Sequence, residues 1–99
     1  MTVLEHARLQ VRPGLQERFE EAFAQAREFI EISPGFRGLT LARCVEEPDV
    51  YLLLVRWDSI EDHEVEFRRS VRYRQWKALL HHFYDPFPVV QHYETVASS

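Results

Sequence analysis

The chain has 99 residues, of which 45% are hydrophobic and 28% charged, and its formal net charge is −4. Residues 1–99 are expected to form a single domain, because a chain of this length has room for one hydrophobic core. Neither nucleic acid nor a membrane is an expected partner, since phosphate contacts need concentrated positive charge and no apolar run approaches the roughly 20 residues of a membrane span. With one cysteine and no signal-peptide pattern, the protein is expected to be cytoplasmic.

The first third of the chain has a strand pattern followed by a helix pattern. Residues 3–11 alternate in character with a period of two, which predicts a strand. Pro13 and Gly14 follow, and proline is well placed at the first position of a helix. Apolar residues then recur at spacings of three and four from Leu15 to Ile30. This spacing predicts a helix of about five turns with one apolar stripe.

The middle of the chain predicts a β-hairpin. Ser33-Pro34-Gly35 ends the helix, because proline disfavours helical geometry in the residue before it and glycine lets the chain turn. Residues 36–45 and 50–57 are rich in β-branched and apolar residues, and the turn-forming segment 46–49 separates them. The two strands are therefore expected to pair antiparallel.

The last third predicts a helical region and a final strand. Ser59 can cap a helix, with Asp62 three residues later, and the helical pattern runs from about residue 60 to 82 with a break near Ser70. Two prolines in 85–88 end it, and residues 89–96 have a strand pattern. The order β-α-β-β-α-β predicts a ferredoxin-like α+β fold with a four-stranded antiparallel sheet and both helices on one face.

The strand at 50–57 is apolar on both of its faces. Two helices can cover only one face of the sheet, so the other face needs a second cover. A second copy of the chain is the expected cover, because closed two-fold association is the commonest way for a small domain to bury such a surface. The sequence therefore predicts a homodimer formed through the sheet face.

Several short motifs occur in sequence along this predicted order of strands and helices. They are Pro13-Gly14, Pro34-Gly35-Phe36, Trp57 with Ser59, and a closing stretch with Phe67, Ser70, Tyr73, Trp76, the run from Leu80 to Pro88 (LHHFYDPFP), and His92. With these motifs the chain resembles the antibiotic biosynthesis monooxygenase (ABM) family of the dimeric α+β barrel superfamily, over nearly its whole length. The resemblance implies a dimeric α+β barrel built from two ferredoxin-like subunits.

The resemblance also implies a reaction. Characterised monooxygenases of this family oxidise polycyclic phenols to quinones with dioxygen, without metal or flavin. It therefore implies a monooxygenase with no cofactor, acting on a small aromatic substrate, phenolic or polyketide-like, in a pocket between the sheet and its own helices. Such chemistry needs a base and a pocket that excludes water. The alternative is a non-catalytic, small-molecule-binding or stress-associated dimer, because one fold hosts many functions.

The candidate site residues are histidines and aromatic residues. His63 is the leading candidate base, since the unperturbed imidazole pKa of about 6.5 suits proton transfer near neutrality. His82 is a second candidate base, and Tyr73 is a candidate because a buried hydroxyl needs a partner. The candidate substrate-binding residues are Trp57, Phe67, Trp76, Phe83, Tyr84 and His92. Each aromatic has a structural alternative, because large rings between helices and a sheet are more often core.

Two other chemistries are disfavoured. Haem-degrading relatives of the family depend on an asparagine in the first strand and on a tryptophan and a histidine along the second helix. The matching positions here carry Ala7, Glu66 and Trp76. A metal site is not expected, because the adjacent His81 and His82 would point about 100° apart on a helix.

Overall fold

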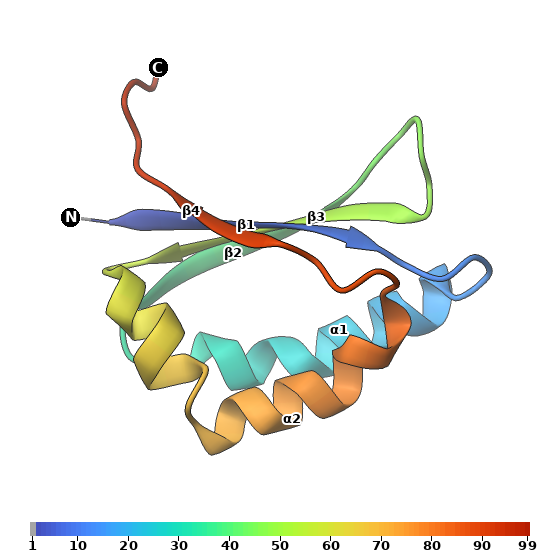
Figure 1. The fold of residues 1–99 in the computed structure, drawn as a ribbon, viewed down its shortest axis with the longest axis horizontal. Coiled ribbons are helices and arrows are strands. Elements are labelled where there is room, and N and C mark those ends of the chain that lie inside the picture. The colour runs from blue at the N-terminus through green and yellow to red at the C-terminus, as the bar shows by residue number, and fades with distance from the viewer. Residues whose placement is uncertain (1) are drawn as a thin grey trace.

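The computed structural model describes residues 2–99 and consists of one antiparallel sheet with helices on one face (Figure 1). The elements in chain order are β1 (Val3–Gln10), α1 (Gln16–Glu31), β2 (Phe36–Arg43), β3 (Val50–Trp57), the π-helical turn η1 (Asp62–Phe67), α2 (Val71–Leu80), the 3₁₀ turn η2 (His81–Phe83) and β4 (Val90–Tyr93). This order confirms the predicted ferredoxin-like α+β fold. Within residues 2–99, no helix is both long and apolar enough to span a bilayer.

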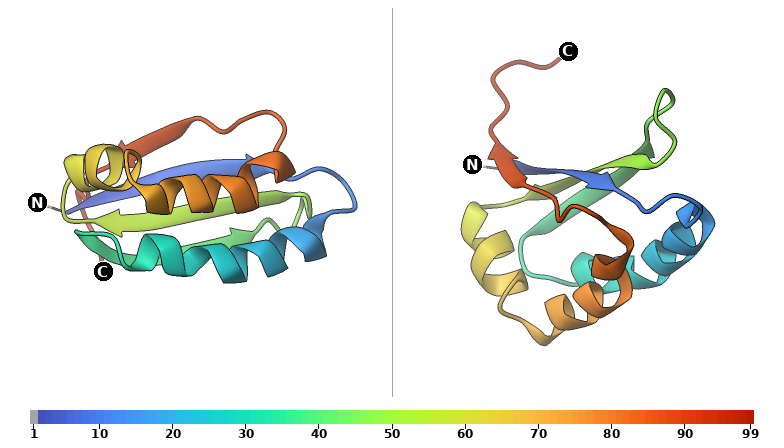
Figure 2. Two further views of the ribbon diagram at one scale, coloured as in Figure 1. Left: turned by 90° about the horizontal axis from the view of Figure 1, so that it is seen from below. Right: turned by 45° about the vertical axis from the view of Figure 1, so that its right-hand side comes forward.

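The four strands lie in the order β2-β3-β1-β4, and every neighbouring pair is antiparallel. The central strands β1 and β3 pair over their whole length, from Val3 opposite Trp57 to Gln10 opposite Val50. The edge strand β4 pairs with β1 over four positions only. Figure 2 shows α1 and α2 lying along the same face of this sheet, which stays open rather than closing into a barrel.

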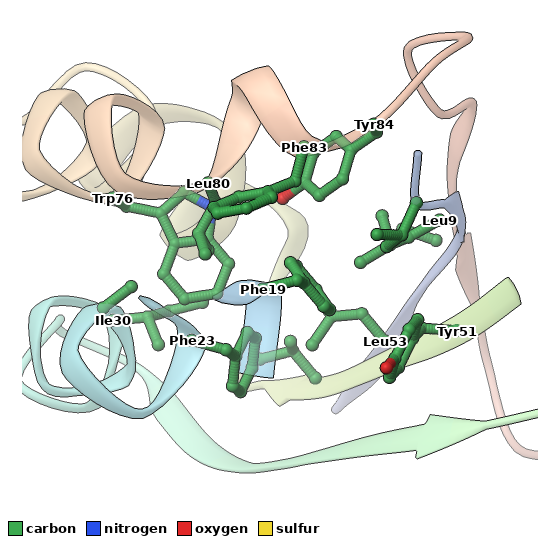
Figure 3. Close-up of a cluster of buried hydrophobic side chains, with 14 of the residues drawn as sticks. Leu9, Phe19, Phe23, Ile30, Tyr51, Leu53, Trp76, Leu80, Phe83 and Tyr84 are labelled. Carbon is green, nitrogen blue, oxygen red and sulfur yellow. The ribbon is translucent and has the colours of Figure 1, made fainter. Parts of the chain in front are cut away.

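The hydrophobic core fills the space between the sheet and the two helices. The period of two in β1 and β3 directs alternate side chains to the helices, so that Leu9 lies opposite Tyr51 and both are buried. The residues labelled in the core view of Figure 3 are Leu9, Phe19, Phe23, Ile30, Tyr51, Leu53, Trp76, Leu80, Phe83 and Tyr84. Burial of each large apolar side chain contributes about 1.5–3 kcal/mol, which makes this cluster the main stabilising feature.

The first helix begins later than the sequence predicted. Pro13 and Gly14 form a turn in which Gly14 has a φ of 83°, and α1 starts at Gln16. The backbone N–H of Leu15 donates to the Arg12 carbonyl, 3.2 Å away, across this turn. The prediction that proline opens the helix was wrong, because the chain needs a left-handed residue here to reverse from strand to helix.

The second helical region is broken near Ser70, as the sequence predicted. Ser59 caps its start by accepting a hydrogen bond from the Asp62 backbone N–H at 3.2 Å. The Ser70 hydroxyl then caps α2: it accepts from the Tyr73 backbone N–H at 3.2 Å and donates to the Phe67 carbonyl at 2.6 Å. This break gives the π-helical turn η1 its own direction, and π-helical turns are frequent at functional sites.

The strands of the sheet's two edges are shorter than predicted. β2 ends at Arg43 rather than at residue 45, and β4 covers Val90–Tyr93 rather than 89–96. β4 has partners only along residues 4–7 of β1, so it ends where that pairing ends. Beyond β4 the chain leaves the sheet on the side opposite the helices (Figure 1).

Within residues 2–99, no helix lies on the face of the sheet that points away from α1 and α2 (Figure 1). Leu4, Leu52 and Leu54 are the large aliphatic side chains on it, and all three are only half-buried. The exposed Arg8 pairs with Leu52 across the strands, and the exposed Arg56 pairs with Leu4. We call this surface the open sheet face; β3 is apolar on both faces, as its sequence indicated.

Candidate functional site

A carboxylate is buried beneath the helices. Glu5 lies on β1 at a position that points to the helices, like Ala7 two residues later, and it is only 5% exposed. Its Oε1 accepts a hydrogen bond from Trp57 Nε1 at 2.9 Å and lies 3.2 Å from His63 Nε2. Burying a charged group without partners is strongly unfavourable, and here β3 and η1 each supply one partner.

Two histidines extend this contact toward the surface. His63, 3% exposed, stacks on Trp57 with ring centroids 5.3 Å apart and planes at 18°. Its Nδ1 lies 2.8 Å from Nε2 of His92, which stands opposite Glu5 in the β1–β4 pairing. The outer nitrogen of His92, Nδ1, is 4.0 Å from the half-exposed carboxylate of Glu64. We call this series of contacts the Glu5–His63–His92 chain.

Burial controls the charge of the two inner groups. Desolvation raises the pKa of Glu5 from 4.5 to about 7, although the Trp57 hydrogen bond and the Arg68 charge act in the opposite direction. Desolvation also lowers the pKa of His63 to about 3, and the positive charges of Arg68 and His92 add to this effect. His63 is therefore neutral near pH 7, and the 3.2 Å approach of its Nε2 to Glu5 Oε1 is a close polar contact rather than an ion pair.

A cavity of about 40 Å³ lies beside Glu5 and His63, between the sheet and the helical layer. Phe67, Trp76 and Tyr84 form part of its aromatic wall. A space of this volume holds a few water molecules. Larger surface hollows, of about 310 and 400 Å³, lie on the open sheet face and between α1 and β2, but none of the three groups of the Glu5–His63–His92 chain lines them.

Two exposed residues, Phe87 and Arg68, are among those that line the cavity. Phe87 is 57% exposed, and it contacts the His81 ring edge-on with centroids 4.9 Å apart. It also lies 6.4 Å from the ring of Tyr84. Phe87 and His81 both line the cavity, so movement of the Phe87 ring would change the size of the site.

The three predicted catalytic candidates occupy different surroundings. His63 is at the centre of the Glu5–His63–His92 chain, and the half-buried Tyr73 lines the cavity. His82 is exposed and is not part of the lining, whereas the preceding His81 is. Successive residues of a 3₁₀ turn point about 120° apart, so only one of the two adjacent histidines can face the cavity. Burial lowers the pKa of His81 to about 4.

The predicted substrate-binding residues also separate into groups. Trp57 is completely buried behind His63, and Phe83 packs in the core against Phe19 with centroids 5.8 Å apart. His92 belongs to the Glu5–His63–His92 chain. The remaining three line the cavity: Phe67, Trp76 and Tyr84.

Sequence reasoning missed four residues that line the cavity: Glu5, Arg68, His81 and Phe87. A signal for Glu5 was present, because an acidic residue at an inward position of an alternating strand must be buried with partners. In the described part of the chain, no group of three His, Cys, Asp or Glu side chains is arranged to hold a metal ion.

The fold and the site together define a ferredoxin-like α+β protein with a buried carboxylate–imidazole pair between its sheet and helices. Residues 2–79 match the family described as "Antibiotic biosynthesis monooxygenase", ABM. The chain therefore belongs to the antibiotic biosynthesis monooxygenase family, which its motifs had indicated.

Individual proteins are similar to this chain to different degrees. The uncharacterized protein YczJ of Bacillus subtilis is 48% identical over 95% of this chain and 99% of its own length. The crystal structure of a candidate antibiotic biosynthesis monooxygenase from Bordetella bronchiseptica is 33% identical, covers 97% of this chain and 98% of its own, and has a TM-score of 0.93. SnoaB, a cofactor-independent oxygenase from Streptomyces nogalater, has the same fold, with a TM-score of 0.77 at 20% identity over 99% of this chain and 95% of its own.

A mycobilin-producing haem oxygenase from Mycobacterium tuberculosis is 33% identical over 62% of this chain and 58% of its own length. Trp76 occupies the position at which the sequence comparison with haem-degrading relatives expects a histidine. The Trp76 ring packs edge-on against Phe23 and Phe67, with centroid separations of 5.6 and 5.9 Å, so it belongs to the core. A tryptophan in this position has no nitrogen lone pair with which to bind iron.

Proposed function

We propose that the protein is a cofactor-independent monooxygenase that oxidises a small phenolic aromatic compound beside Glu5 and His63. One observation carries this proposal: a buried carboxylate, 3.2 Å from a buried imidazole, borders an aromatic-lined cavity. Membership of the ABM family and the fold shared with SnoaB support a monooxygenase-type reaction.

Glu5 is the proposed base. A general base is most effective when its pKa lies near the working pH, and burial raises the pKa of Glu5 to about 7. Deprotonation of the phenol by Glu5 gives an electron-rich phenolate that dioxygen can oxidise. For an anthrone-like substrate, the reacting methylene carbon loses two hydrogens and becomes a carbonyl. One oxygen atom of O₂ enters the product and the other leaves as water, so the substrate supplies all the electrons.

The other residues of the site position the base and exclude water. Trp57 donates its indole N–H to Glu5 and stacks on His63, so it holds both groups in place. The aromatic wall keeps the reacting carbon away from bulk water. The cavity of about 40 Å³ is smaller than a phenolic ring system, so exposed lining side chains such as Phe87 or Arg68 have to move outward to admit the substrate.

The reaction is tested by incubating the purified protein with anthrone-like phenols and hydroquinones in air. Oxygen uptake and the mass of the product are the readouts. Uptake should be lost in Glu5→Gln and retained in Glu66→Gln, a matched control on the exposed side of η1. Full activity in Glu5→Gln would overturn the role of Glu5, and tight binding without oxygen uptake would favour the non-catalytic binding protein.

We also propose that two copies associate through the open sheet face. Leu4, Leu52 and Leu54 leave apolar surface partly exposed there, and a second copy would cover it symmetrically. Sedimentation should give twice the mass of one chain at micromolar concentration. Leu52→Asp should shift the equilibrium to monomer, while Ile32→Asp, at a site 70% exposed beside α1, should not. A wild-type monomer at this concentration would contradict the proposal.

A further inference from the structure

We infer that Glu5, His63 and His92 form a proton relay that connects the cavity with the surface of the protein. The relay would carry away the proton that Glu5 takes from the substrate, and in that use it rests on the proposed function. Its existence does not depend on the substrate, because the three groups and their contacts belong to the protein alone. The relay can therefore be tested without turnover.

The geometry of the relay is continuous from the cavity outward. Glu5 borders the cavity and lies 3.2 Å from His63 Nε2. On the other side of the same ring, His63 Nδ1 lies 2.8 Å from His92 Nε2. His92 lies on the edge strand β4, where 13% of its side chain is exposed and its Nδ1 is 4.0 Å from the half-exposed carboxylate of Glu64. Three different elements, β1, η1 and β4, thus place their side chains in line.

The number of available hydrogens permits two complete hydrogen-bonding arrangements of the side chains of Glu5, His63 and His92. A neutral imidazole has one N–H donor and one acceptor nitrogen. When Glu5 carries the proton, its hydroxyl donates to His63 Nε2. His63 must then donate from Nδ1 to His92 Nε2, and the outer nitrogen of His92 carries a hydrogen that faces Glu64. The indole N–H of Trp57 can only donate, so Glu5 accepts it in this arrangement and in the other.

The second arrangement is the reverse. Ionised Glu5 accepts a hydrogen bond from His63 Nε2–H, and His63 Nδ1 accepts one from His92 Nε2–H. His92 Nδ1 then carries no hydrogen. Passing from the first arrangement to the second breaks one O–H bond on Glu5 and forms one N–H bond on His63. The Nδ1 hydrogen of His63 moves to His92, and the Nδ1 hydrogen of His92 passes to water. One proton thus leaves Glu5 for solvent, and no side chain has to rotate.

Besides Glu5 and His63, four titratable or charged residues line the cavity: Arg68, Tyr73, His81 and Tyr84. On the sheet side the nearest polar group is the Trp57 indole, which does not titrate. Arg68, which follows η1, favours the ionised form of Glu5. From α2 and the segment after η2, Tyr73 and Tyr84 face the cavity, and burial raises the pKa of both hydroxyls. His81 of η2 also faces the cavity, with its pKa lowered to about 4 by burial.

The test is nitrogen NMR of the whole chain, labelled at its histidines and titrated from about pH 5.5 to 8.5. Where His92 is neutral, His63 should change from the Nδ1–H form below the Glu5 midpoint to the Nε2–H form above it. The midpoint should coincide with that of the Glu5 carboxyl, followed by carbon NMR, near its pKa of about 7. A His63 ring that keeps one tautomer throughout, or becomes an imidazolium in this range, overturns the relay.

Two variants test the ends of the relay. Glu5→Gln has the same shape and cannot titrate, so His63 should hold one tautomer at every pH. His92→Gln keeps a hydrogen-bonding side chain opposite His63, but an amide cannot pass a proton on. Exchange of the His63 ring hydrogen with water should therefore slow at least tenfold, and an unchanged rate would overturn the role of His92. Glu66→Gln is the control and should leave both readouts unchanged.

These readouts separate the relay from the proposed reaction. A His63 tautomer change without oxygen uptake on any phenol would support the relay and count against the monooxygenase. Oxygen uptake with a fixed His63 tautomer would support the enzyme and exclude the relay.

Discussion

The ionisation of Glu5 should make the stability of the protein depend on pH in a way that Glu5→Gln removes. The pKa of this carboxyl is raised from 4.5 to about 7 in the folded chain, so between these values the folded state binds more protons than the unfolded state. The resulting stabilisation is fully present below pH 4.5 and is lost as the pH rises through about 7. At about 1.4 kcal/mol per pKa unit, the loss is about 3 kcal/mol.

His63 contributes a dependence of the opposite sign. Its pKa is lowered from 6.5 to about 3, so its stabilising contribution is present above pH 6.5 and is lost as the pH falls toward 3. The wild-type curve contains both effects, which partly cancel between pH 4.5 and 6.5. When the free energy of unfolding of wild type is subtracted from that of Glu5→Gln, most of the His63 contribution cancels, because both proteins contain this histidine.

The measurement is urea unfolding, followed by tryptophan fluorescence at fixed protein concentration from pH 4.5 to 8.5. The free energy of unfolding of Glu5→Gln, relative to wild type, should rise by about 3 kcal/mol between pH 4.5 and the region above pH 7, and then level off. Glu66→Gln should show no such rise, because its side chain is exposed to water in the folded protein. A difference between Glu5→Gln and wild type that stays constant across this range would refute the reasoning about burial.

Three further substitutions test individual contacts. Trp57→Phe removes the indole donor that lowers the pKa of Glu5, so the carboxyl midpoint in carbon NMR should move above about 7; an unchanged midpoint would show that this hydrogen bond is unimportant. Gly35→Ala should destabilise the chain by about 2 kcal/mol in urea unfolding, because Gly35 has a φ of 78° and a Cβ there would collide with the Asp62 side chain. Ser70→Ala should cost about 1 kcal/mol by the same assay, since α2 loses its capping hydroxyl, and wild-type stability would contradict that role.

Much of the fold followed from local patterns in the sequence. The alternation in residues 3–11 identified β1 and put Glu5 on the same side as Ala7 and Leu9, which is the side that packs against the helices. The three- and four-residue spacing up to Ile30 identified the buried stripe of α1. These predictions succeeded because backbone geometry repeats over a few residues, so side chains that share a face are recognisable from their spacing.

The turns and the ends of the helices and strands were harder to predict from the sequence. The sequence indicated a helix from Pro13 onward, but the reversal at Gly14 delays its start to Gln16. It also indicated a break near Ser70 without revealing that the preceding segment is a π-helical turn. Such details depend on which backbone groups find partners nearby, and spacing alone does not specify them.

The site depends on contacts that no local pattern contains. Trp57 reaches Glu5 across 52 residues of sequence, and His92 reaches His63 across 29. Local periodicity shows which way a side chain points from its own strand or helix. The packing of η1 and β4 around β1 decides which polar groups it meets, how far they are from water, and therefore which of them can hold a proton near neutral pH.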